Sequence, residues 1–503
     1  MEVKTTNIKG CYVIKLDYFG DHRGGFMETF SEEKYKNIGI PYEYVQDNMS
    51  YSVHENVFRG LHCQKEDHSQ GKLVSCSEGE VADYIVDIRK NSPTYMNSER
   101  IMLSKDNHVQ VYVPEGCLHG FEVLKAPATF NYKVTRLYNK EADAGVLCTD
   151  PDINLPLPDL EKMVLSEKDQ NLPRLKDSNI EYKYMPRCLV TGAITGQLGP
   201  EVVEQLKTRG YRDIYALDKE TVDLTDEKKV KETILRFQPD VIFHCAAYTD
   251  VDGAQRNKEL ANKINKEGTK YIVQSAKEIN AKVIYISTDY VFSGKEEGIY
   301  ETNSETNPQS VYGETKLAGE KEVTSYDKHF VVRTSWVFGG INTKNFVKTM
   351  LELSDRFKEI TVVNDQFGSP TYAKDLAKFL IDMSETDKYG IYHANNEGYC
   401  SWNEFANKIF ELASKETVAL AVSTKEYYGT DSMKKKIREL ASLKETVEIT
   451  EEIFKSVIAP RPLNSKLSKE CLVENGFDKL RHWEDATSEY VKKLELHKME
   501  RGN

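Results

Sequence analysis

Arg187-Cys-Leu-Val-Thr-Gly-Ala-Ile-Thr-Gly-Gln-Leu-Gly199 is the stretch that decides the fold of the second part of this chain. It starts with a short apolar run, typical of a buried strand, and continues as a glycine-rich turn into a helix. Such a turn normally opens a dinucleotide-binding domain, with the pyrophosphate at the helix N-terminus. Here it begins only at residue 187, so the sequence predicts a separate domain before it.

From this turn onward, apolar runs and amphipathic segments alternate. This rhythm predicts an α/β doubly wound Rossmann domain over residues 187–503, with a small C-terminal substrate-binding portion. We expect strands at 188–191, 214–217, 241–245, 283–287 and 330–334. We expect helices at 198–209, 226–237 and 257–279, and another that starts at 311.

The glycine loop is weak evidence alone, because Gly192, Gly196 and Gly199 do not follow the usual spacing. Asp218 ends the second expected strand about 20 residues later, where a carboxylate can accept hydrogen bonds from a ribose. Lys219 beside it can accommodate a 2′-phosphate. The sequence therefore predicts a nicotinamide cofactor and leaves the choice between NADPH and NADH open.

Tyr312 and Lys316 are four residues apart and share one face of the expected helix. We expect the nearby ammonium to lower the pKa of the phenol toward a value useful for proton transfer. Thr288 ends a central strand, and its hydroxyl can share a substrate carbonyl oxygen with Tyr312. This set predicts proton transfer to a carbonyl.

The first part reads differently, as short alternating strands broken by turns. Segments 10–16, 81–88 and 108–113 each alternate apolar and polar side chains, as half-buried strands do. Frequent short strands predict an all-β jelly-roll (cupin-like) barrel over residues 1–180, which can hold one small ligand in its mouth. Residues 172–186 are expected to form a short linker.

A His-x-His pair would point to a metal in such a barrel, but Gln64 stands where the second His of the pair would be. The ligand set around His62 is therefore incomplete, and we predict no metal. Net charge is −12, with 68 basic and 80 acidic residues, which argues against a nucleic-acid surface.

The N-terminus lacks the apolar core of a signal peptide, and the longest apolar runs are too short to cross a bilayer. Nine cysteines without CxxC spacing indicate reduced thiols in a cytoplasmic protein.

The polar residues of the first part resemble dTDP-4-dehydrorhamnose 3,5-epimerase. The motifs run in order as Asp21-x-Arg23-Gly-x-Phe26, Gln46-Asp-Asn48, Arg59-Gly-Leu-His62-x-Gln64, Gly71-Lys72, Ser92-Pro-Thr94, Pro114-x-Gly116-x-x-His119-Gly-Phe121 and Leu165-Ser-Glu-Lys168-Asp169.

The resemblance implies a cofactor-independent epimerisation beside a ketone. By this resemblance His62 is the base, Asp169 orients it, Lys72 faces the enolate oxygen and Tyr132 is the acid. The substrate contacts that it implies are Arg23, Glu28, Gln46, Asp47, Asn48, Arg59, His119, Tyr138, Asp143 and Lys168. It also implies a homodimer through this domain.

The second part resembles the extended short-chain dehydrogenase/reductase superfamily, and within it dTDP-4-dehydrorhamnose reductase. The finer motifs are Ala246-Ala-Tyr-Thr-Asp-Val-Asp252, Ser287-Thr-Asp-Tyr-Val-Phe292, Arg333-Thr-Ser-Trp-Val-Phe-Gly339, Asp365-Gln-x-Gly-Ser-Pro-Thr371 and Arg461-Pro-x-Asn-Ser465. Cofactor contacts are implied at Gln197, Leu198, Asp223, Leu224, Ala246, Ala247 and Tyr248. Sugar contacts are implied at Thr288, Asp289 and Trp336.

Together these resemblances predict a bifunctional enzyme that makes dTDP-L-rhamnose from dTDP-4-dehydro-6-deoxy-D-glucose. Three alternatives remain: the same reactions on a UDP-linked sugar, a non-catalytic cofactor-binding regulator, and a metal-dependent oxygenase or isomerase in the first part. The charged stretch 414–446 is expected to form an added surface helix.

Overall fold

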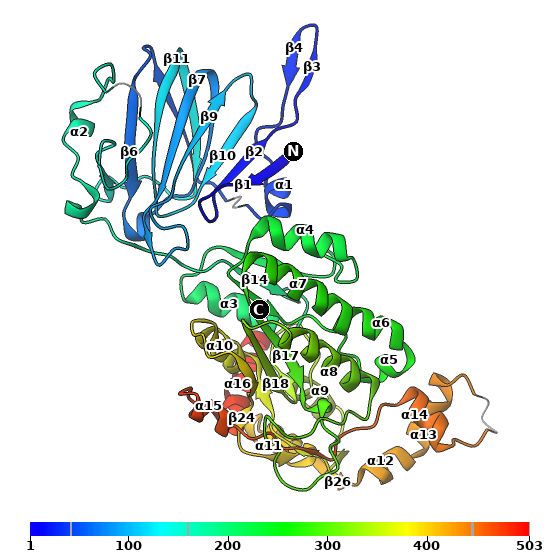
Figure 1. Cartoon of the computed structure of the whole chain (residues 1–503). Coiled ribbons are helices and arrows are strands. Elements are labelled where there is room, and N and C mark those ends of the chain that lie inside the picture. Colours follow the sequence, from blue (N-terminus) through cyan, green and yellow to red (C-terminus); the bar gives the residue numbers. More distant parts are fainter. Residues whose placement is uncertain (41–42, 158–159, 444–446, 502–503) are drawn as a thin grey trace. The chain divides into compact units, whose positions relative to one another are not determined.

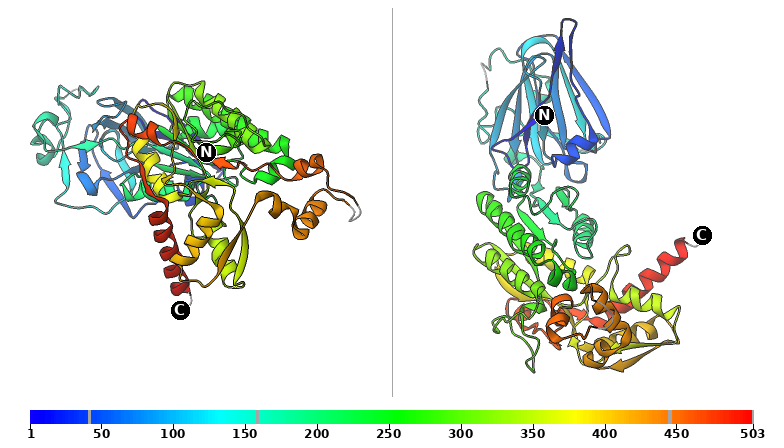
Figure 2. Two further views of the ribbon diagram at one scale, coloured as in Figure 1. Left: turned by 90° about the horizontal axis from the view of Figure 1, so that it is seen from below. Right: turned by 90° about the vertical axis from the view of Figure 1, so that its right-hand side faces the viewer.

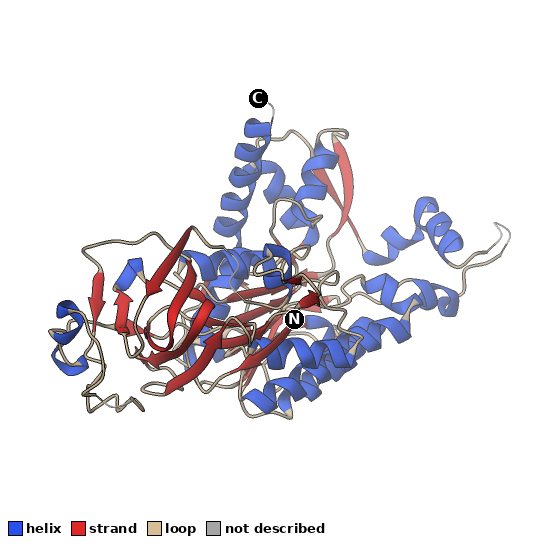
Figure 3. Ribbon diagram, turned by 90° about the horizontal axis from the view of Figure 1, so that it is seen from above, coloured by secondary structure: helices blue, strands red, loops and turns tan. Residues whose placement is uncertain are grey.

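The computed structural model describes residues 1–40, 43–157, 160–443 and 447–501. The chain divides into two compact units (Figure 1). Unit 1 comprises Met1–Pro186 with Arg236–Gln238, and unit 2 comprises Arg187–Leu235 and Pro239–Asn503. Coloured by secondary structure, unit 1 is mainly strand and unit 2 mixes helix and strand (Figure 3).

The described part of unit 1 consists mainly of antiparallel strands, with one parallel pair, two short α-helices and two 3-10 turns (Glu66–His68 and Leu175–Asp177). Its elements are β1 (Glu2–Thr5), β2 (Tyr12–Lys15), β3 (Phe19–Asp21), β4 (Gly24–Phe26), α1 (Glu32–Asn37), β5 (Gln46–Ser52), β6 (Phe58–Gln64), β7 (Lys72–Asp87), β8 (Arg89–Lys90), β9 (Ser98–Ser104), β10 (Val109–Val113), β11 (Cys117–Val134), β12 (Asp143–Gly145), α2 (Glu167–Gln170) and β13 (Tyr182–Lys183).

Two long strands, β7 and β11, pair with each other in the nine-stranded sheet of this unit, and each pairs with two further strands along its length. Strand β7 pairs with β10 through residues 72–75 and with β9 through residues 80–86. Strand β11 pairs with β6 through residues 119–122 and with β5 through residues 128–134. Both strands bend near Gly79, whose φ is +75° and whose Cβ would lie 2.4 Å from the Lys125 carbonyl oxygen.

An apolar core that includes Val74, Ile85, Phe121 and Phe130 contains side chains from both halves of β7 and β11. Residues 81–87 of β7 and 117–123 of β11 are buried on both faces, because Tyr84, Val86 and Leu118 pack into a second apolar core. The expectation that the strand at 81–88 is half-buried was therefore wrong. The predicted antiparallel, cupin-like fold of the first part is confirmed.

Unit 2 alternates strands and helices, then adds a region of short sheets and helices. Its strands are β14 (Cys188–Thr191), β15 (Ile214–Leu217), β16 (Val241–His244), β17 (Lys282–Thr288), β18 (His329–Thr334), β19 (Val337–Phe338), β20 (Glu359–Val363), β21 (Phe367–Gly368), β22 (Thr371–Tyr372), β23 (Gly390–His393), β24 (Asn396–Glu397), β25 (Cys400–Ser401), β26 (Val418–Val422), β27 (Asn464–Ser465) and β28 (Leu480–His482). Its helices are α3 (Gly199–Thr208), α4 (Glu227–Phe237), α5 (Val251–Arg256), α6 (Lys258–Asn262), α7 (Thr269–Ile279), α8 (Val311–Thr324), α9 (Phe346–Ser354), α10 (Ala373–Ser384), α11 (Trp402–Leu412), α12 (Thr424–Gly429), α13 (Asp431–Leu440), α14 (Glu451–Val457), α15 (Glu470–Glu474) and α16 (Trp483–Arg501).

The central sheet of unit 2 has six parallel strands in the order β15-β14-β16-β17-β18-β23. Strands β14 and β16 are buried along their whole length, as expected for a sheet covered on both faces. The chain reverses its direction of travel across the sheet between β14 and β16, which creates a crevice at their carboxyl ends. The predicted doubly wound fold is confirmed.

The expected helix at 257–279 is interrupted. A π-helical turn, Lys263–Gly268, separates α6 from α7. The buried Asn265 side chain lies in this turn, accepts from the Tyr248 backbone N–H at 2.7 Å and donates to the Thr315 hydroxyl at 3.0 Å. Such turns often occur beside functional sites, and periodicity alone does not reveal them.

The stretch 414–446 differs from the single surface helix expected there. It contains β26, α12 and α13, and its residues 444–446 lie outside the described part of the chain. Ile437 of α13 is buried against Val457 and Ile458, so these elements have a small apolar core of their own. Figure 2 shows them in orange. Along the described parts of the chain, no helix combines the length and apolar character needed to cross a membrane.

Candidate active sites

A cavity of about 560 Å³ opens in unit 1 between β6, β7, β11 and α2. His62 on β6 lies directly across the strand pair from His119 on β11. The two strands approach closely because Gly60 has no side chain: its φ is +131°, and a Cβ there would lie 2.6 Å from the Cα of Gly120. The fold thus brings two imidazoles to one pocket.

His62 is joined to a buried carboxylate. Its Nε2 lies 2.6 Å from Oδ1 of Asp169, which is 4% exposed. Ser166 caps α2 and accepts from the Asp169 backbone N–H at 3.1 Å, which fixes the position of that residue. Burial opposes ionisation, yet the hydrogen bond from His62 holds the pKa of Asp169 below its usual value. With Nε2 donating to Asp169, Nδ1 is the nitrogen that can accept a proton.

Lys72 and Tyr132 share the same face of the sheet, on neighbouring strands. Tyr132 pairs with Val74, and Lys72 lies two residues before Val74, so the two side chains are diagonal neighbours. Burial lowers the pKa of Lys72 and raises the pKa of Tyr132. The phenol therefore keeps its proton at neutral pH and can act as a donor.

A second imidazole–carboxylate pair lies on β11 and β7, next to the first. His119 Nε2 is 2.8 Å from Oδ1 of Asp83, and both side chains are buried. Burial lowers the pKa of His119 despite that carboxylate, which favours a neutral ring.

Among the expected substrate contacts, Arg59, Tyr138, Asp143 and Lys168 line the cavity together with His119. Lys168 Nζ donates to Asp143 Oδ2 at 2.6 Å, and the Tyr138 hydroxyl donates to the same oxygen at 3.3 Å. These contacts tie the cavity rim together.

The structure does not bring the other expected contacts into this cavity: Arg23, Glu28, Gln46, Asp47 and Asn48. These residues lie on or near the hairpin β3–β4 and on β5. Their side chains are engaged locally: Arg23 with Asp21 at 2.7 Å, Glu28 with Lys34 at 2.8 Å, Asp47 with Lys133 at 2.8 Å, and Gln46 with Asn48 at 2.8 Å.

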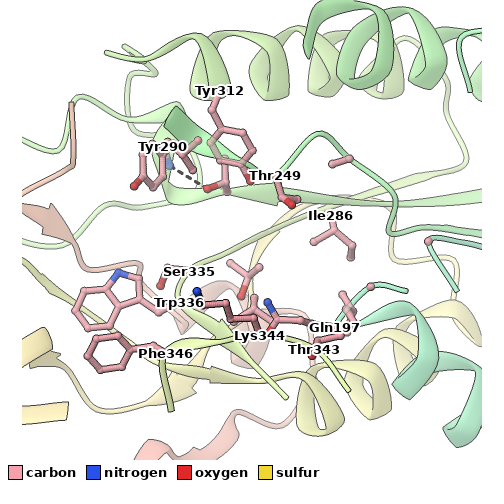
Figure 4. Close-up of a pocket in the computed structure, with 18 of the residues that line it drawn as sticks. Gln197, Thr249, Ile286, Tyr290, Tyr312, Ser335, Trp336, Thr343, Lys344 and Phe346 are labelled. Atoms are coloured by element: carbon pink, nitrogen blue, oxygen red, sulfur yellow. Dashed lines mark hydrogen bonds between the residues drawn. The ribbon is translucent and has the colours of Figure 1, made fainter. Parts of the chain in front are cut away.

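A cavity of about 1260 Å³ lies in unit 2 at the carboxyl ends of the parallel strands (Figure 4). Gly192, with a φ of +65°, lets the loop after β14 approach β16, because a Cβ there would lie 3.1 Å from Ala246. A Cβ on Gly199 would lie 2.1 Å from the Gly192 carbonyl oxygen. These close approaches leave the N-terminus of α3 open to the cavity, which suits the pyrophosphate of a dinucleotide.

Most of the expected cofactor contacts line this cavity: Gly192, Gly196, Gln197, Leu198, Gly199, Asp218, Asp223, Leu224, Ala246, Ala247, Tyr312 and Lys316. Tyr248 does not, and its ring packs beside Ala254, Ala261 and Val311. The Asp218 carboxylate accepts from the backbone N–H of Thr195 at 3.0 Å and of Lys219 at 2.6 Å. Asp218 therefore also holds the glycine loop.

Tyr312, Lys316 and Thr288 all line this cavity. Burial raises the pKa of Tyr312 to about 12, and the Thr288 hydroxyl partly opposes this. Burial lowers the pKa of Lys316 to about 7, and its ammonium nitrogen lies 3.9 Å from the centre of the Tyr285 ring. We expected Lys316 to lower the pKa of Tyr312, and this expectation was wrong. Burial disfavours the charged phenolate and raises the pKa, and the spacing of the two residues along the helix gives no information on burial.

Two further expected residues, Asp289 and Trp336, lie beside this set. Burial raises the pKa of Asp289 to about 6, although hydrogen bonds from Ser465 and Thr288 lower it. The Ser465 hydroxyl donates to Asp289 Oδ2 through a short hydrogen bond. Trp336 stacks on Trp402 with ring centroids 3.7 Å apart, which gives the cavity a flat aromatic wall.

Sequence reasoning gave no role to Tyr290, Gln366, Tyr427, Tyr428 and Arg461, which also line the larger cavity. Tyr290, Gln366 and Arg461 lie inside the motifs that carry the family resemblance, so a signal existed for these three. Tyr427 and Tyr428 lie in the charged stretch, where nothing in the pattern singled them out. Within the described ranges, no group of three His, Cys, Asp or Glu residues is placed to hold a metal.

Comparisons with known proteins divide the chain at the same region. Residues 5–177 match the family model for dTDP-4-dehydrorhamnose 3,5-epimerase, and residues 186–496 match the model for the RmlD substrate binding domain.

Three relatives illustrate the similarity. Spore coat polysaccharide biosynthesis protein SpsK of Bacillus subtilis (strain 168) is 38% identical over 309 residues, which cover 61% of this chain and 97% of that protein. A crystal structure of dTDP-4-dehydrorhamnose reductase from Bacillus anthracis str. Ames, in complex with NADP, is 37% identical and covers 62% of this chain and 100% of its own, with a TM-score of 0.54. A crystal structure of dTDP-6-deoxy-D-glucose-3,5-epimerase from Legionella pneumophila Philadelphia 1, in complex with dTDP-4-keto-L-rhamnose, is 38% identical and covers 37% of this chain and 98% of its own, with a TM-score of 0.35.

Proposed function

This chain belongs to the dTDP-4-dehydrorhamnose reductase family, with a dTDP-4-dehydrorhamnose 3,5-epimerase region fused before it, and from that premise we propose that it makes dTDP-L-rhamnose in two successive steps. Unit 1 epimerises dTDP-4-dehydro-6-deoxy-D-glucose at C3 and C5. Unit 2 then reduces the C4 ketone with a nicotinamide cofactor. The observation that carries this proposal is that each of the two cavities holds its own set of acid–base groups.

In the first site we assign the base to Nδ1 of His62, which removes the proton from the carbon beside the ketone. Asp169 holds the ring by its other nitrogen and stabilises the charged imidazolium. The electron pair moves to the ketone oxygen, where the Lys72 ammonium offsets the enolate charge. The Tyr132 hydroxyl returns a proton on the opposite face.

In the second site we assign proton donation to the C4 oxygen to the Tyr312 hydroxyl. The high pKa of about 12 keeps that phenol protonated. The Thr288 hydroxyl donates to Asp289 Oδ1 at 3.0 Å, and we propose that it turns to donate to the C4 oxygen of the sugar instead. Hydride for C4 comes from the reduced nicotinamide when it is bound. Asp289 and Trp336 hold the sugar.

We propose NADPH as the preferred cofactor. Lys219 lies in the cavity beside Asp218, where an ammonium can pair with a 2′-phosphate. The Asp218 carboxylate, which would favour the ribose of NADH, already accepts two backbone N–H groups. A Lys219→Ala variant with unchanged KM values for both NADPH and NADH would contradict this choice.

We also propose a homodimer through unit 1. We propose that the first domain extends beyond the expected end at residue 180 to residue 186, because β13 pairs with β8, and that the second domain begins at residue 187. Phe19 and Phe26, which pair across β3 and β4, are 66% and 68% exposed, and Met49 on β5 is 67% exposed. Exposed apolar side chains of this kind suit contact with a second copy. Arg23 lies between β3 and β4, and neither Arg23 nor Glu28 lines the cavity of unit 1. A solution mass equal to one chain, measured by light scattering, would contradict the dimer.

We place the enzyme in the cytoplasm, because all nine cysteines are free thiols. Localisation of a tagged chain outside the cytoplasm would contradict this.

We propose a dTDP-linked rather than a UDP-linked keto sugar as the substrate. Turnover of the dTDP-linked and UDP-linked keto sugars, compared at equal concentration, tests the proposal. Faster turnover of the UDP form would favour that alternative, and no turnover of either would favour a regulatory role.

A further inference from the structure

One end of the larger cavity, beyond Tyr290, is formed by residues that the proposed reaction does not use. Helix α12 supplies Tyr427 and Tyr428, and the chain after α14 supplies Arg461. Figure 4 shows Tyr290 at the opposite side of the cavity from Gln197 of the glycine loop. This end therefore lies away from the pyrophosphate site of the cofactor.

Helix α12 is held firmly at this place. The Asp365 carboxylate accepts from the Thr424 backbone N–H at 2.8 Å and from the Thr424 hydroxyl at 2.6 Å. Gln366 donates to the same hydroxyl at 2.9 Å. At the other end of the helix, the Tyr428 ring packs edge-on against Phe454 with centroids 5.1 Å apart. The α12 tyrosines are therefore preorganised beside the cavity, which lowers the entropic cost of binding.

Arg461 brings a positive charge to this end of the cavity. Its guanidinium pairs with Asp252 at 3.0 Å. Burial opposes the charge, but Tyr290, Asp252 and Tyr428 raise the pKa of Arg461. Its Nη1 is buried and has no hydrogen-bond partner among the residues that the structure describes. A buried donor without a partner is costly, unless a ligand supplies the acceptor.

The path from the catalytic phenol to Arg461 is short. The Tyr290 ring lies edge-on to Tyr312 with centroids 5.4 Å apart, and Tyr290 in turn neighbours Arg461. A hexose that presents C4 to Tyr312 carries its diphosphate at C1, on the far side of the ring. The diphosphate then extends away from Tyr312, and a guanidinium is well suited to bind it there.

We propose that Arg461 and Tyr427 form the nucleoside-diphosphate subsite of the reductase cavity. Arg461 binds the diphosphate, and the Tyr427 ring, half-buried and 5.5 Å from that of Tyr428, stacks on the base. Tyr428 is a positioning residue for Arg461. The charged stretch is thus a substrate-recognition element of unit 2, and this assignment rests on the proposed reductase function.

An assay of the reverse reaction tests this subsite without any contribution from the epimerase activity of unit 1. Oxidation of dTDP-L-rhamnose by NADP⁺ uses only the reductase cavity of the full chain, and NADPH absorbance follows it. Arg461→Gln and Tyr427→Ala are compared with Lys434→Gln, a matched control on the exposed face of α13. For each chain we measure kcat, both KM values, and inhibition by dTDP and by thymidine.

Arg461→Gln should raise the KM for dTDP-L-rhamnose and the inhibition constant of dTDP about tenfold or more, because a charge-assisted contact is lost. Thymidine has no phosphate, so its inhibition constant should stay unchanged. Tyr427→Ala should raise the constants of both inhibitors about fivefold, since a stacking contact is lost. In both variants, kcat and the KM for NADP⁺ should match those of Lys434→Gln.

Unchanged KM and inhibition constants in Arg461→Gln, with an active wild type, would overturn the subsite alone. An equal rise of the KM for NADP⁺ would also overturn it, since that indicates general distortion of the cavity. If Arg461→Gln does not fold, thymidine inhibition of Tyr427→Ala decides. A wild type that cannot oxidise dTDP-L-rhamnose contradicts the proposed function itself, and the subsite with it.

Discussion

Nε2 of His62 lies 2.6 Å from Oδ1 of Asp169, although 107 residues separate the two in the chain. Strand β6 carries the imidazole and the short helix α2 carries the carboxylate. The pair fixes which ring nitrogen is free, and it offsets the positive charge that the ring gains on accepting a proton. The proposed removal of a proton by His62 depends on this contact.

Loss of either member of this pair should slow proton abstraction. His62→Ala should stop solvent deuterium from entering C3 and C5 of the keto sugar. Asp169→Asn should slow it by about 10²-fold, because the amide no longer stabilises the imidazolium. Mass spectrometry of the sugar measures both effects, and NADP⁺ reduction by dTDP-L-rhamnose serves as the folding control. Wild-type exchange in His62→Ala would show that another group is the base.

Tyr312→Phe should abolish most of the reductase activity and leave the epimerase activity intact. Removal of the hydroxyl eliminates the proposed proton donor, so reductase turnover should fall by about 10²- to 10⁴-fold. Deuterium entry catalysed by unit 1 should continue at the wild-type rate, and NADPH should still bind. Undiminished NADPH oxidation would refute the assignment of Tyr312.

Ser465→Ala should shift the pH dependence of the reductase. Burial raises the pKa of Asp289 to about 6, and the hydrogen bond from Ser465 partly restrains this rise. Without that donor the pKa should rise further, so the carboxylate is protonated at higher pH. The acid limb of kcat/KM for the sugar should move upward from pH 6, and kcat/KM for NADPH should not. An unshifted limb would mean that Asp289 does not titrate in this reaction.

Lys316→Met should change how stability depends on pH. Burial lowers the pKa of Lys316 to about 7 from an ordinary 10.5, so between these values the unfolded chain binds more protons than the folded one. The destabilisation by the buried ammonium is full below pH 7 and fades as pH rises toward 10.5. Lys316→Met should therefore raise the Tm of unit 2 most at pH 6 and least at pH 9, by calorimetry. A pH-independent difference would contradict this titration.

The sequence revealed the βαβ order well, because buried parallel strands such as β14 are continuous apolar runs. The π-helical turn escaped it, since that turn depends on what the buried Asn265 contacts. The pairing of His62 with Asp169 came only from family resemblance, because no local pattern joins residues so far apart. The pKa of Tyr312 was misjudged because spacing along a helix does not report burial. The sequence did not predict that Tyr427 and Arg461 line the same cavity, because only the folded structure brings α12 to it.

Incubation of the full chain with dTDP-4-dehydro-6-deoxy-D-glucose in D₂O, with and without NADPH, measures both proposed activities in one experiment. Without NADPH, we predict deuterium at C3 and C5 and no reduced sugar. With NADPH present, we predict that one NADPH is oxidised for each keto sugar reduced. The product should be dTDP-L-rhamnose that carries deuterium at both C3 and C5. Consumption of NADPH without deuterium at C3 and C5 would contradict the account, because the ketone would then be reduced without epimerisation.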